Sequence, residues 1–420
     1  MVIDRAEGVW LYDLEGNRYL DGVSSMWCNL LGHRQPQIDQ AIRDQLDRVA
    51  HSTSLGMACT PAVVLAKRLA DLAPGDLQHV FYASDGSSAV EVALKMAYQY
   101  WQQCENPQPV KTKYIALGQA YHGDTLGSAS VGGIERFHAL FKPLLFDVVR
   151  LPIPDSRANT LEHFLAELEE VLQNQHGKIA ALVLEPLVQG AAGMVFHPAG
   201  YLRGVRELTR RYDVLLIADE IVTGFGRTGR MFACEQEDVT PDFLCLGKSI
   251  TGGYLPLSAT LTCPEIFSAF LGPPTNTFLH GHTYGGNPLA AAAALATLDV
   301  LQDQQILCQS EARIQQLAEI LGRLQSHTHV AETRQWGMIA AVELTPGRDQ
   351  ENAYPEEIKI GSRVCKEMLR RGVWIRPLRD VLVIMPPLSI SSDELELLGN
   401  VLLESIDLVC EEIASVVSSV

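Results

Sequence analysis

Short apolar runs alternate with longer amphipathic stretches through the middle of the chain. The runs read HVFYAS, KYIAL, IAALVLEP, VLLIADE, FLCLG and LSATLT, at residues 79–84, 113–117, 179–186, 214–220, 243–247 and 257–262. Strands that are apolar on both faces and separated by helices are typical of a mostly parallel sheet covered on two sides. The pattern therefore predicts an α/β fold for this region.

The two ends of the chain have a different pattern. Alternating runs on both sides of Glu15-Gly16-Asn17 predict a hairpin, and a helix is expected over about 36–49. Ser391 and Glu394 form a capping-box signature for a closing helix that runs to about Val417. Between these ends we expect helices at 288–301, 303–325 and 355–371, and strands at 339–344, 373–377 and 381–387.

These elements predict two domains. Residues 1–50 and 315–420 are expected to form a small α+β domain from both chain ends, and residues 51–314 a large domain with the mostly parallel sheet. A length of 420 residues leaves room for both.

Composition and charge narrow the class of protein. A net charge of -17 argues against nucleic acid or an anionic membrane as the main partner, because both reward clustered Lys and Arg. The nine cysteines are scattered and lack a Cys-x-x-Cys pair, so we expect core thiols in a reducing compartment. The N-terminal residues have no apolar signal-peptide core. A cytoplasmic protein is expected.

A helix start with glycine and serine follows the strand at 79–84. Gly86 and Ser87 stand there, and apolar residues recur at helical spacing from Val90 to Trp101. Free backbone N–H groups and the positive end of the helix dipole suit a phosphate at such a position. A capped helix without any ligand has the same pattern, so this motif alone leaves both interpretations open.

Two charged residues end neighbouring apolar strands. Asp219 closes the run at 214–220, and Lys248 follows the run at 243–247. Parallel strands joined by crossovers place these ends on one edge of the sheet, where open α/β sheets bind ligands. No phosphate-binding loop precedes Asp219 and no histidine cluster lies near it in sequence, so a metal site is not predicted.

A lysine, a carboxylate and a phosphate-binding helix start on one sheet edge are what pyridoxal phosphate requires. The lysine forms a Schiff base, the acid lies beside the ring nitrogen, and the helix N-terminus holds the phosphate. The combination is more specific than any of its parts, and it predicts a pyridoxal-phosphate enzyme.

Several longer motifs resemble the class III aminotransferases, which have fold type I of the pyridoxal-phosphate-dependent transferases. They are YHGDTLGSASVGG at 121–133, EPLVQGAAGM at 185–194, LLIADEIVTGFGRTG at 215–229, FLCLGKSITGG at 243–253 and HGHTYGGNP at 280–288. The resemblance covers nearly the whole chain. YHGDT, QGAAGM, ACEQ, SATLT and GVWIRP together point to one subgroup of the family.

The resemblance implies roles for the cofactor-side residues. Lys248 would attach the cofactor covalently, Asp219 would hydrogen-bond the ring nitrogen, and Tyr121 would stack on the ring. The backbone N–H groups of Gly86 and Ser87 would hold the phosphate. Thr283, with His282 beside it, would reach the phosphate in the neighbouring subunit, which implies a homodimer with shared active sites.

On the substrate side the resemblance points to Arg376 as the residue that binds the carboxylate of the keto substrate. A planar guanidinium can bind a carboxylate at both of its oxygens. Met26 and Trp27 would line the substrate channel, and Gly281 would lie at its mouth near the partner subunit. Asp124 would lie near the substrate amine. Arg227 fits a structural role and a substrate role equally well.

Three departures from the family pattern bear on the substrates. Many members carry an N-terminal aromatic segment of the His-Pro-Tyr-Thr kind, and this sequence begins after it. Met26 stands where many members have a second tryptophan, and Val383 where a tyrosine is common. S-adenosylmethionine and lysine therefore both remain open as amino donor.

Other activities share the same cofactor residues. An ω-amino-acid or diamine aminotransferase, or an aminomutase, would retain Lys248 and Asp219, and only acceptor-side residues such as Arg376 and Trp27 distinguish them. A catalytically silent relative is disfavoured because Lys248, Asp219 and Tyr121 are all present.

Overall fold

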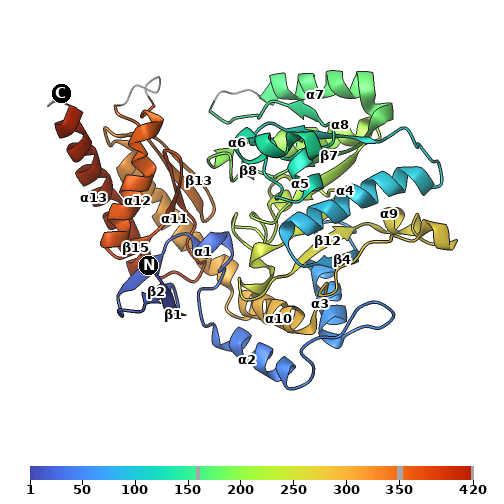
Figure 1. The fold of residues 1–420 in the computed structure, drawn as a ribbon, viewed down its shortest axis with the longest axis horizontal. Coiled ribbons are helices and arrows are strands. Elements are labelled where there is room, and N and C mark those ends of the chain that lie inside the picture. The colour runs from blue at the N-terminus through green and yellow to red at the C-terminus, as the bar shows by residue number, and fades with distance from the viewer. Residues whose placement is uncertain (158–160, 348–352, 418–420) are drawn as a thin grey trace. The chain divides into compact units, whose positions relative to one another are not determined.

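The computed structural model describes residues 1–157, 161–347 and 353–417. The chain divides into two compact units (Figure 1). The larger unit comprises Gln40–Phe225 and Arg230–Thr297, and the smaller comprises Met1–Asp39, Gly226–Gly229 and Leu298–Val420. The smaller unit is built mainly from both ends of the chain and the larger from its middle. Their boundaries differ from the predicted ones, which lay after residues 50 and 314.

A seven-stranded sheet forms the centre of the larger unit. Its strands, in spatial order, are β4 (His79–Ala83), β12 (Ser258–Thr262), β11 (Phe243–Leu246), β10 (Leu215–Asp219), β7 (Ile179–Leu184), β5 (Lys113–Leu117) and β6 (Val149–Leu151). β12 is antiparallel to both of its neighbours, and the strands from β11 to β6 are parallel. The predicted mostly parallel α/β sheet is confirmed, while the three-residue strand β6 was not predicted.

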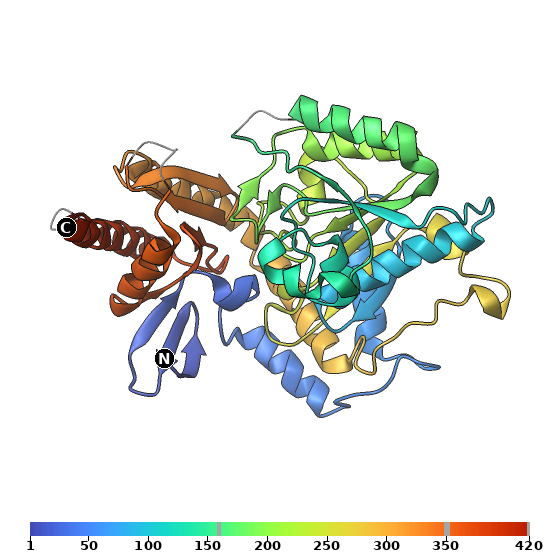
Figure 2. The same cartoon turned by 45° about the horizontal axis from the view of Figure 1, so that its top comes forward.

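Helix α4 (Gly86–Gln103) covers one face of this sheet. Its small residues Ala89, Ala93 and Ala97 are fully buried against alternate residues of the strands, among them Ile217 and Phe243. The intervening strand residues are buried as well. Helices α7 (Leu161–Gln175) and α8 (Tyr201–Arg211) pack together away from α4 (Figures 1 and 2). Burial on both faces explains why these strands read as continuous apolar runs.

The other elements of the larger unit include α2 and α10, each of which crosses a boundary between the two units. The remaining helices are α2 (Pro36–Leu46), α3 (Thr60–Leu72), α5 (Leu126–Val131), α6 (Glu135–His138), α9 (Pro264–Ser268) and α10 (Pro288–Asp303). The two-residue strands β8 (Val188–Gln189) and β9 (Val195–Phe196) pair with each other. The 3₁₀ segments are η1 (Ala139–Leu144), η2 (His176–Lys178), η3 (Ala233–Glu237), η4 (Lys248–Thr251) and η5 (Pro274–Asn276).

The smaller unit contains two four-stranded sheets. One has the order β1 (Ile3–Glu7), β2 (Trp10–Asp13), β3 (Arg18–Asp21) and β15 (Val373–Trp374), and the parallel β3–β15 pair joins the two ends of the chain. The other has the order β13 (Val330–Trp336), β14 (Ile339–Leu344), β17 (Val381–Ile384) and β16 (Arg376–Leu378). Its helices are α1 (Ser24–Trp27), α11 (Ile306–Gln325), α12 (Ile360–Arg370) and α13 (Ser392–Val417), with the 3₁₀ turn η6 (Glu356–Ile358).

The local sequence signals of this unit are mostly confirmed. The hairpin β2–β3 turns at Gly16, whose φ of 85° suits glycine. The capping box is present in both directions: the Ser391 N–H donates to Glu394 Oε2 at 2.9 Å, and the Glu394 N–H donates to Ser391 Oγ at 3.3 Å. β13 was not predicted, because its sequence VAETRQW mixes polar and apolar residues.

Several predicted boundaries were wrong. The helix expected from 355 begins at Ile360, after the 3₁₀ turn η6, and the helix expected to reach 49 ends at Leu46. The strand expected at 373–377 is divided between β15 and β16 at Ile375, so its two halves join different sheets. No helix in the described ranges is long and apolar enough to cross a membrane.

Candidate active site

The predicted cofactor residues follow adjacent parallel strands of the larger unit. Asp219 is the last residue of β10 and pairs with Cys245 of β11. Lys248 begins the turn η4, three positions beyond Cys245, and its side chain is half-buried. Its φ of 38° is left-handed, a conformation that costs energy for a residue with a side chain. Asp219 and Lys248 therefore lie at the same edge of the sheet, as predicted.

Asp219 is held by two hydrogen bonds in the protein interior. Its Oδ2 lies 2.8 Å from Nδ1 of His122, and its Oδ1 accepts the N–H of Ile221 at 3.1 Å. Asp219 is 5% exposed, and the other ring nitrogen of His122 is buried without a hydrogen-bond partner within the described chain. The pair fixes the direction of the carboxylate.

The start of α4 leaves N–H groups for a ligand. Asp85 is the N-cap, and its Oδ1 accepts the Ser88 N–H at 2.9 Å. The first N–H groups of a helix have no acceptor within it, so those of Gly86 and Ser87 remain for another partner. A Cβ on Gly86 would lie 2.8 Å from Ile221, and one on Gly123 would lie 2.0 Å from Ser87 Oγ. The two glycines allow the segments around the helix start to approach closely.

Tyr121 is fixed from both ends. Its peptide N–H donates to Glu185 Oε1 at 3.0 Å, and its hydroxyl donates to Asp124 Oδ2 at 2.8 Å. Burial, with the hydrogen bond to Asp124 as the next cause, raises the pKa of the Tyr121 hydroxyl. The Asp124 N–H donates to Ser87 Oγ at 3.2 Å, which links Tyr121 to the helix start. Tyr121, Asp124 and Ser87 thus form one connected group.

Two further carboxyl groups are buried beside Asp219. Glu185 follows β7, and its carboxyl accepts the N–H groups of Tyr121 and Gly190, both at 3.0 Å. The side chain of Glu220 points toward η3, where its carboxyl oxygens accept the N–H groups of Ala233 at 2.6 Å and Cys234 at 2.8 Å. Burial raises the pKa of each carboxyl to about 7.

These residues fit pyridoxal phosphate. The N–H groups at a helix start suit a phosphate, and the glycines leave space beside it. Asp219 is a fixed, buried carboxylate that can face a protonated ring nitrogen, and Lys248 supplies the amine. Which of them contact the cofactor remains a prediction.

The predicted loop contacts lie on the surface of the larger unit. Gly281, His282 and Thr283 are all exposed, in the segment that precedes α10. The ring of His282 lies 5.2 Å from that of His280, centroid to centroid. Exposure agrees with the predicted contact to a second subunit but does not test it.

Three predicted substrate residues lie in the smaller unit, and two of them touch. Arg376 is the first residue of β16, and its Nη1 lies 2.9 Å from Sδ of Met26. Met26 is 48% exposed, and Trp27 beside it is half-buried with a left-handed φ of 63°. Met26 and Arg376 thus form one exposed patch on this unit.

Arg227 is fully buried in the smaller unit. Its Nη1 donates to the Pro386 carbonyl at 2.5 Å, while Nε and Nη2 have no hydrogen-bond partner within the described chain. Burial lowers the pKa of its guanidinium to about 10, and the charges of Cys28 and Asp21 oppose that shift. The bond to Pro386 gives Arg227 a structural role, and its two unpaired nitrogens keep the substrate role open.

Sequence reasoning missed three participants at the sheet edge. Asp85 caps α4, His122 bonds Asp219, and Glu185 bonds the Tyr121 peptide. A signal existed for Asp85, since an acid before Gly-Ser-Ser is a typical N-cap. Glu185 also ends an apolar strand, as Asp219 does. For His122, the residue after Tyr121, the sequence held no comparable signal.

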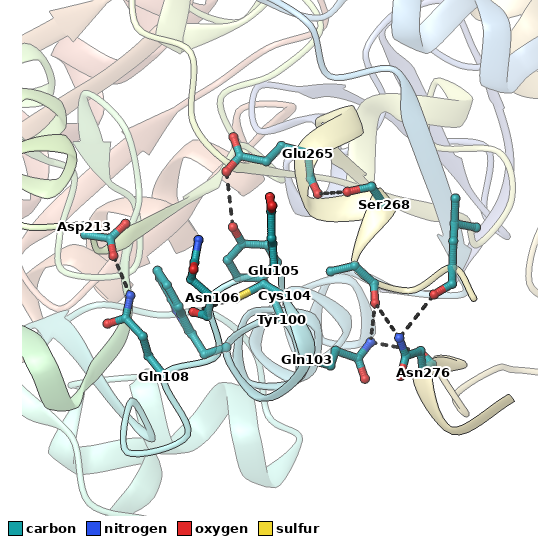
Figure 3. Close-up of a pocket in the computed structure, with 13 residues that line it drawn as sticks. Tyr100, Gln103, Cys104, Glu105, Asn106, Gln108, Asp213, Glu265, Ser268 and Asn276 are labelled. Carbon is teal, nitrogen blue, oxygen red and sulfur yellow. Dashed lines mark hydrogen bonds between the residues drawn. The ribbon is translucent and has the colours of Figure 1, made fainter. Parts of the chain in front are cut away.

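A separate cavity of about 450 Å³ lies at the far end of α4 (Figure 3). Its lining includes the carboxylates Glu105, Asp213 and Glu265, and Glu265 accepts the Tyr100 hydroxyl at 3.2 Å. Neither Lys nor Arg is among its described lining residues, and none of the predicted site residues lines it. It is therefore not the anionic cofactor's site.

Comparison with known proteins shows the family of this chain. A family model described as aminotransferase class III matches residues 1–406. The chain is 52% identical, over 94% of its length and 75% of the relative, to the adenosylmethionine-8-amino-7-oxononanoate aminotransferase of Nitratidesulfovibrio vulgaris.

Solved structures agree. The enzyme of the same name from Methanocaldococcus jannaschii is 42% identical with a TM-score of 0.92, covering 97% of this chain and 93% of that one. An amine transaminase from an uncultivated Pseudomonas species, solved with PLP bound, is 35% identical with a TM-score of 0.90, covering 97% and 94%.

Fold and site thus define a transaminase of the pyridoxal-phosphate-dependent type I fold. The chain belongs to the class III aminotransferases. These enzymes depend on pyridoxal phosphate, which is therefore the cofactor of this protein.

Proposed function

We propose that the chain converts 7-keto-8-aminopelargonate to 7,8-diaminopelargonate in biotin biosynthesis. The observation that carries this proposal is the 52% identity, over 94% of the chain, with a relative named for that reaction. The motifs YHGDT, QGAAGM, ACEQ, SATLT and GVWIRP support the same subgroup.

The cofactor would be held by four groups of this chain. Gly86 and Ser87 would bind its phosphate through backbone N–H groups, Asp219 would face its ring nitrogen, and Lys248 would attach it. When bound, pyridoxal phosphate supplies an electron sink that stabilises negative charge on the carbon bearing the transferred nitrogen. The bond from His122 to Asp219, 2.8 Å long, supports a carboxylate fixed in one orientation for this purpose.

Lys248 would also carry the proton. Once the donor amine has displaced it, its Nζ can accept a proton from the donor carbon and deliver one at the next step. Tyr121 would cover the ring face, and its tether to Glu185 and Asp124 supports that fixed position. The two substrates would react in turn, by a ping-pong scheme.

The acceptor would be bound through its two ends. Arg376 would bind the carboxylate, since its exposed guanidinium can form two parallel hydrogen bonds. Met26 and Trp27 would line the path, and Asp124 would lie near the substrate amine. Gly281 would lie at the mouth of the channel. The 2.9 Å contact between Arg376 Nη1 and Met26 Sδ supports a shared surface for the first two.

We propose S-adenosylmethionine as the amino donor, with lysine as the alternative. The names of the relatives support the first. Met26 in place of a second tryptophan keeps lysine under consideration, because the family resemblance links a single tryptophan at this position to lysine as the donor in some relatives.

We further propose a homodimer in the cytoplasm. Thr283 and His282 would reach the partner's cofactor phosphate, and their exposure supports this. Large apolar side chains are also exposed nearby in sequence, with Leu279 at 86% and Tyr284 at 61%. All nine cysteines are free, which supports a reducing compartment.

A half-reaction screen tests the function. The purified holoenzyme is mixed in turn with S-adenosylmethionine, lysine, ornithine or a β-amino acid, and loss of the cofactor's visible absorption is followed. Conversion by S-adenosylmethionine and turnover with 7-keto-8-aminopelargonate would support the proposal. Conversion only by ω-amino acids other than lysine would contradict it and favour an amine transaminase, to which the chain is also 35% identical.

A further inference from the structure

Glu185 occupies the middle of the sheet edge that carries the candidate site. β7 lies between β10 and β5, and Leu184 pairs with Ala218. Glu185 is therefore next to Asp219 across the sheet, while the segment holding Tyr121 and His122 follows β5 on its other side.

The carboxyl of Glu185 bridges two loops. Oε1 accepts the Tyr121 N–H and Oε2 accepts the Gly190 N–H, both at 3.0 Å, so each oxygen holds one peptide. His122 is the next residue after Tyr121, and its Nδ1 lies 2.8 Å from Asp219 Oδ2. Displacing the Tyr121 peptide would displace both its ring and the imidazole.

We propose that Glu185 is a positioning residue for the cofactor's ring: it fixes the Tyr121–His122 dipeptide, and through His122 it orients the carboxylate of Asp219. The proposal rests on the roles of Tyr121 and Asp219 in the proposed function. Glu185 itself touches neither substrate nor reacting atoms in this assignment.

The Glu185 carboxyl can also act on the site through its charge. It is 5% exposed, so its charge is poorly screened. Burial raises its pKa to about 7, a net value to which His122 and the two peptide N–H groups contribute a lowering and Asp219 a raising. Burial, and next the charge of Glu185, raise the pKa of the Tyr201 hydroxyl, and His197 is the other titratable group near Glu185. Above neutral pH the group is a second anion beside Asp219.

Glu220 offers a matched control. It is also a buried glutamate just past a strand, also accepts two peptide N–H groups, and also has a pKa raised to about 7 by burial. Its partners Ala233 and Cys234 lie in η3 and outside the candidate site. A merely structural role would make E185Q and E220Q behave alike.

Two measurements test the proposal. In hydrogen exchange on the cofactor-free protein, E185Q should speed exchange in peptides containing Tyr121 or Gly190, because glutamine offers only one acceptor oxygen. E220Q should do so only around Ala233 and Cys234. Unchanged exchange at both Tyr121 and Gly190 would overturn the proposed tether.

The second measurement is the pH titration of the bound cofactor's visible absorption. A nearby anion favours protonated forms, so E185Q should move the midpoint to lower pH by about one unit. E185D, which keeps the charge, should shift the midpoint less than E185Q does. E220Q should also shift it less, because the Glu220 carboxyl points to the N–H groups of Ala233 and Cys234. Equal shifts in E185Q and E220Q, or none in E185Q, would overturn the proposal.

The two readouts separate this proposal from the proposed function. A wild-type protein that acquires no visible band would contradict the roles of Lys248 and Asp219, and exchange at Tyr121 would still decide on Glu185. If E185Q does not fold, E185D tests the tether, since its shorter side chain cannot reach both peptides and should speed exchange at one of them.

Discussion

His122 and Asp219 form a hydrogen bond of 2.8 Å between two buried side chains that are 97 positions apart. The bond leaves Asp219 with one oxygen on the imidazole and the other on the Ile221 N–H. A carboxylate anchored in this way keeps one direction without rearrangement when a ligand arrives.

Replacing His122 tests the strength of this anchor. H122F leaves Asp219 Oδ2 buried without a donor, so the free energy of unfolding should fall by about 1–3 kcal/mol. Affinity for pyridoxal phosphate should also fall. Urea unfolding and cofactor titration measure the two effects.

H176F is the control for that variant. His176 is exposed, and within the described ranges its ring makes a hydrogen bond only to the Leu172 carbonyl, so its loss should change neither quantity appreciably. Equal effects from H122F and H176F would show that the hydrogen bond to Asp219 contributes neither to stability nor to cofactor affinity.

The second prediction concerns covalent attachment. Borohydride reduction of the holoenzyme should leave the pyridoxyl group on the peptide that contains Lys248, and K248A should retain no label. Mass spectrometry of the digested protein gives the result. K142A, which removes an exposed lysine on η1, should label as the wild type does. Label at another lysine in the wild type would refute the assignment.

The fold was accessible from sequence wherever burial decided it. Asp219 and Lys248 could be placed at one sheet edge because β10 and β11 are buried on both faces and therefore appear as unbroken apolar runs. The capping box of Ser391 and Glu394 was equally local, since it joins residues three apart.

Contacts between distant residues could not be predicted in this way. Tyr121 and Glu185 are 64 positions apart, and Met26 and Arg376 are 350 apart. No periodicity or spacing in the sequence predicts either contact, because each depends on the order of the strands and on the paths of the loops. The family resemblance supplied the identity of single residues such as Arg376 but not these pairings.

The third prediction concerns the acceptor's carboxylate. R376A should raise the KM for the keto acid about ten- to hundredfold with a smaller change in kcat, because a paired hydrogen bond to a charged group is lost. R376K keeps the positive charge but not the planar guanidinium, so its KM should lie between those of the wild type and R376A. Steady-state kinetics with varied acceptor distinguishes them.

R370A is the matched control, since that guanidinium is 80% exposed and, among the residues that the structure describes, forms an ion pair only with Glu367 on its own helix. It should leave KM unchanged. An R376A variant with wild-type KM would remove Arg376 from the substrate site.

The fourth prediction follows from a buried histidine. His197 is 3% exposed; its Nδ1 bonds the Pro154 carbonyl at 2.9 Å, and its Nε2 has no partner within the described chain. Burial lowers its pKa to about 4, from 6.5, so the folded protein keeps the ring neutral. Below pH 6.5 the unfolded chain binds a proton that the folded chain does not, and stability is lost as pH falls from 6.5 through 4.

Once the pH is below both pKa values, this pKa shift lowers the free energy of unfolding by about 3 kcal/mol. The urea midpoint of the wild type should therefore drop more between pH 7.5 and pH 5 than that of H197Q, which has no ring to protonate. H163Q, at an exposed histidine, should follow the wild type. Parallel curves for wild type and H197Q would mean that His197 is protonated in the folded protein, since its Nε2 would then have found an acceptor.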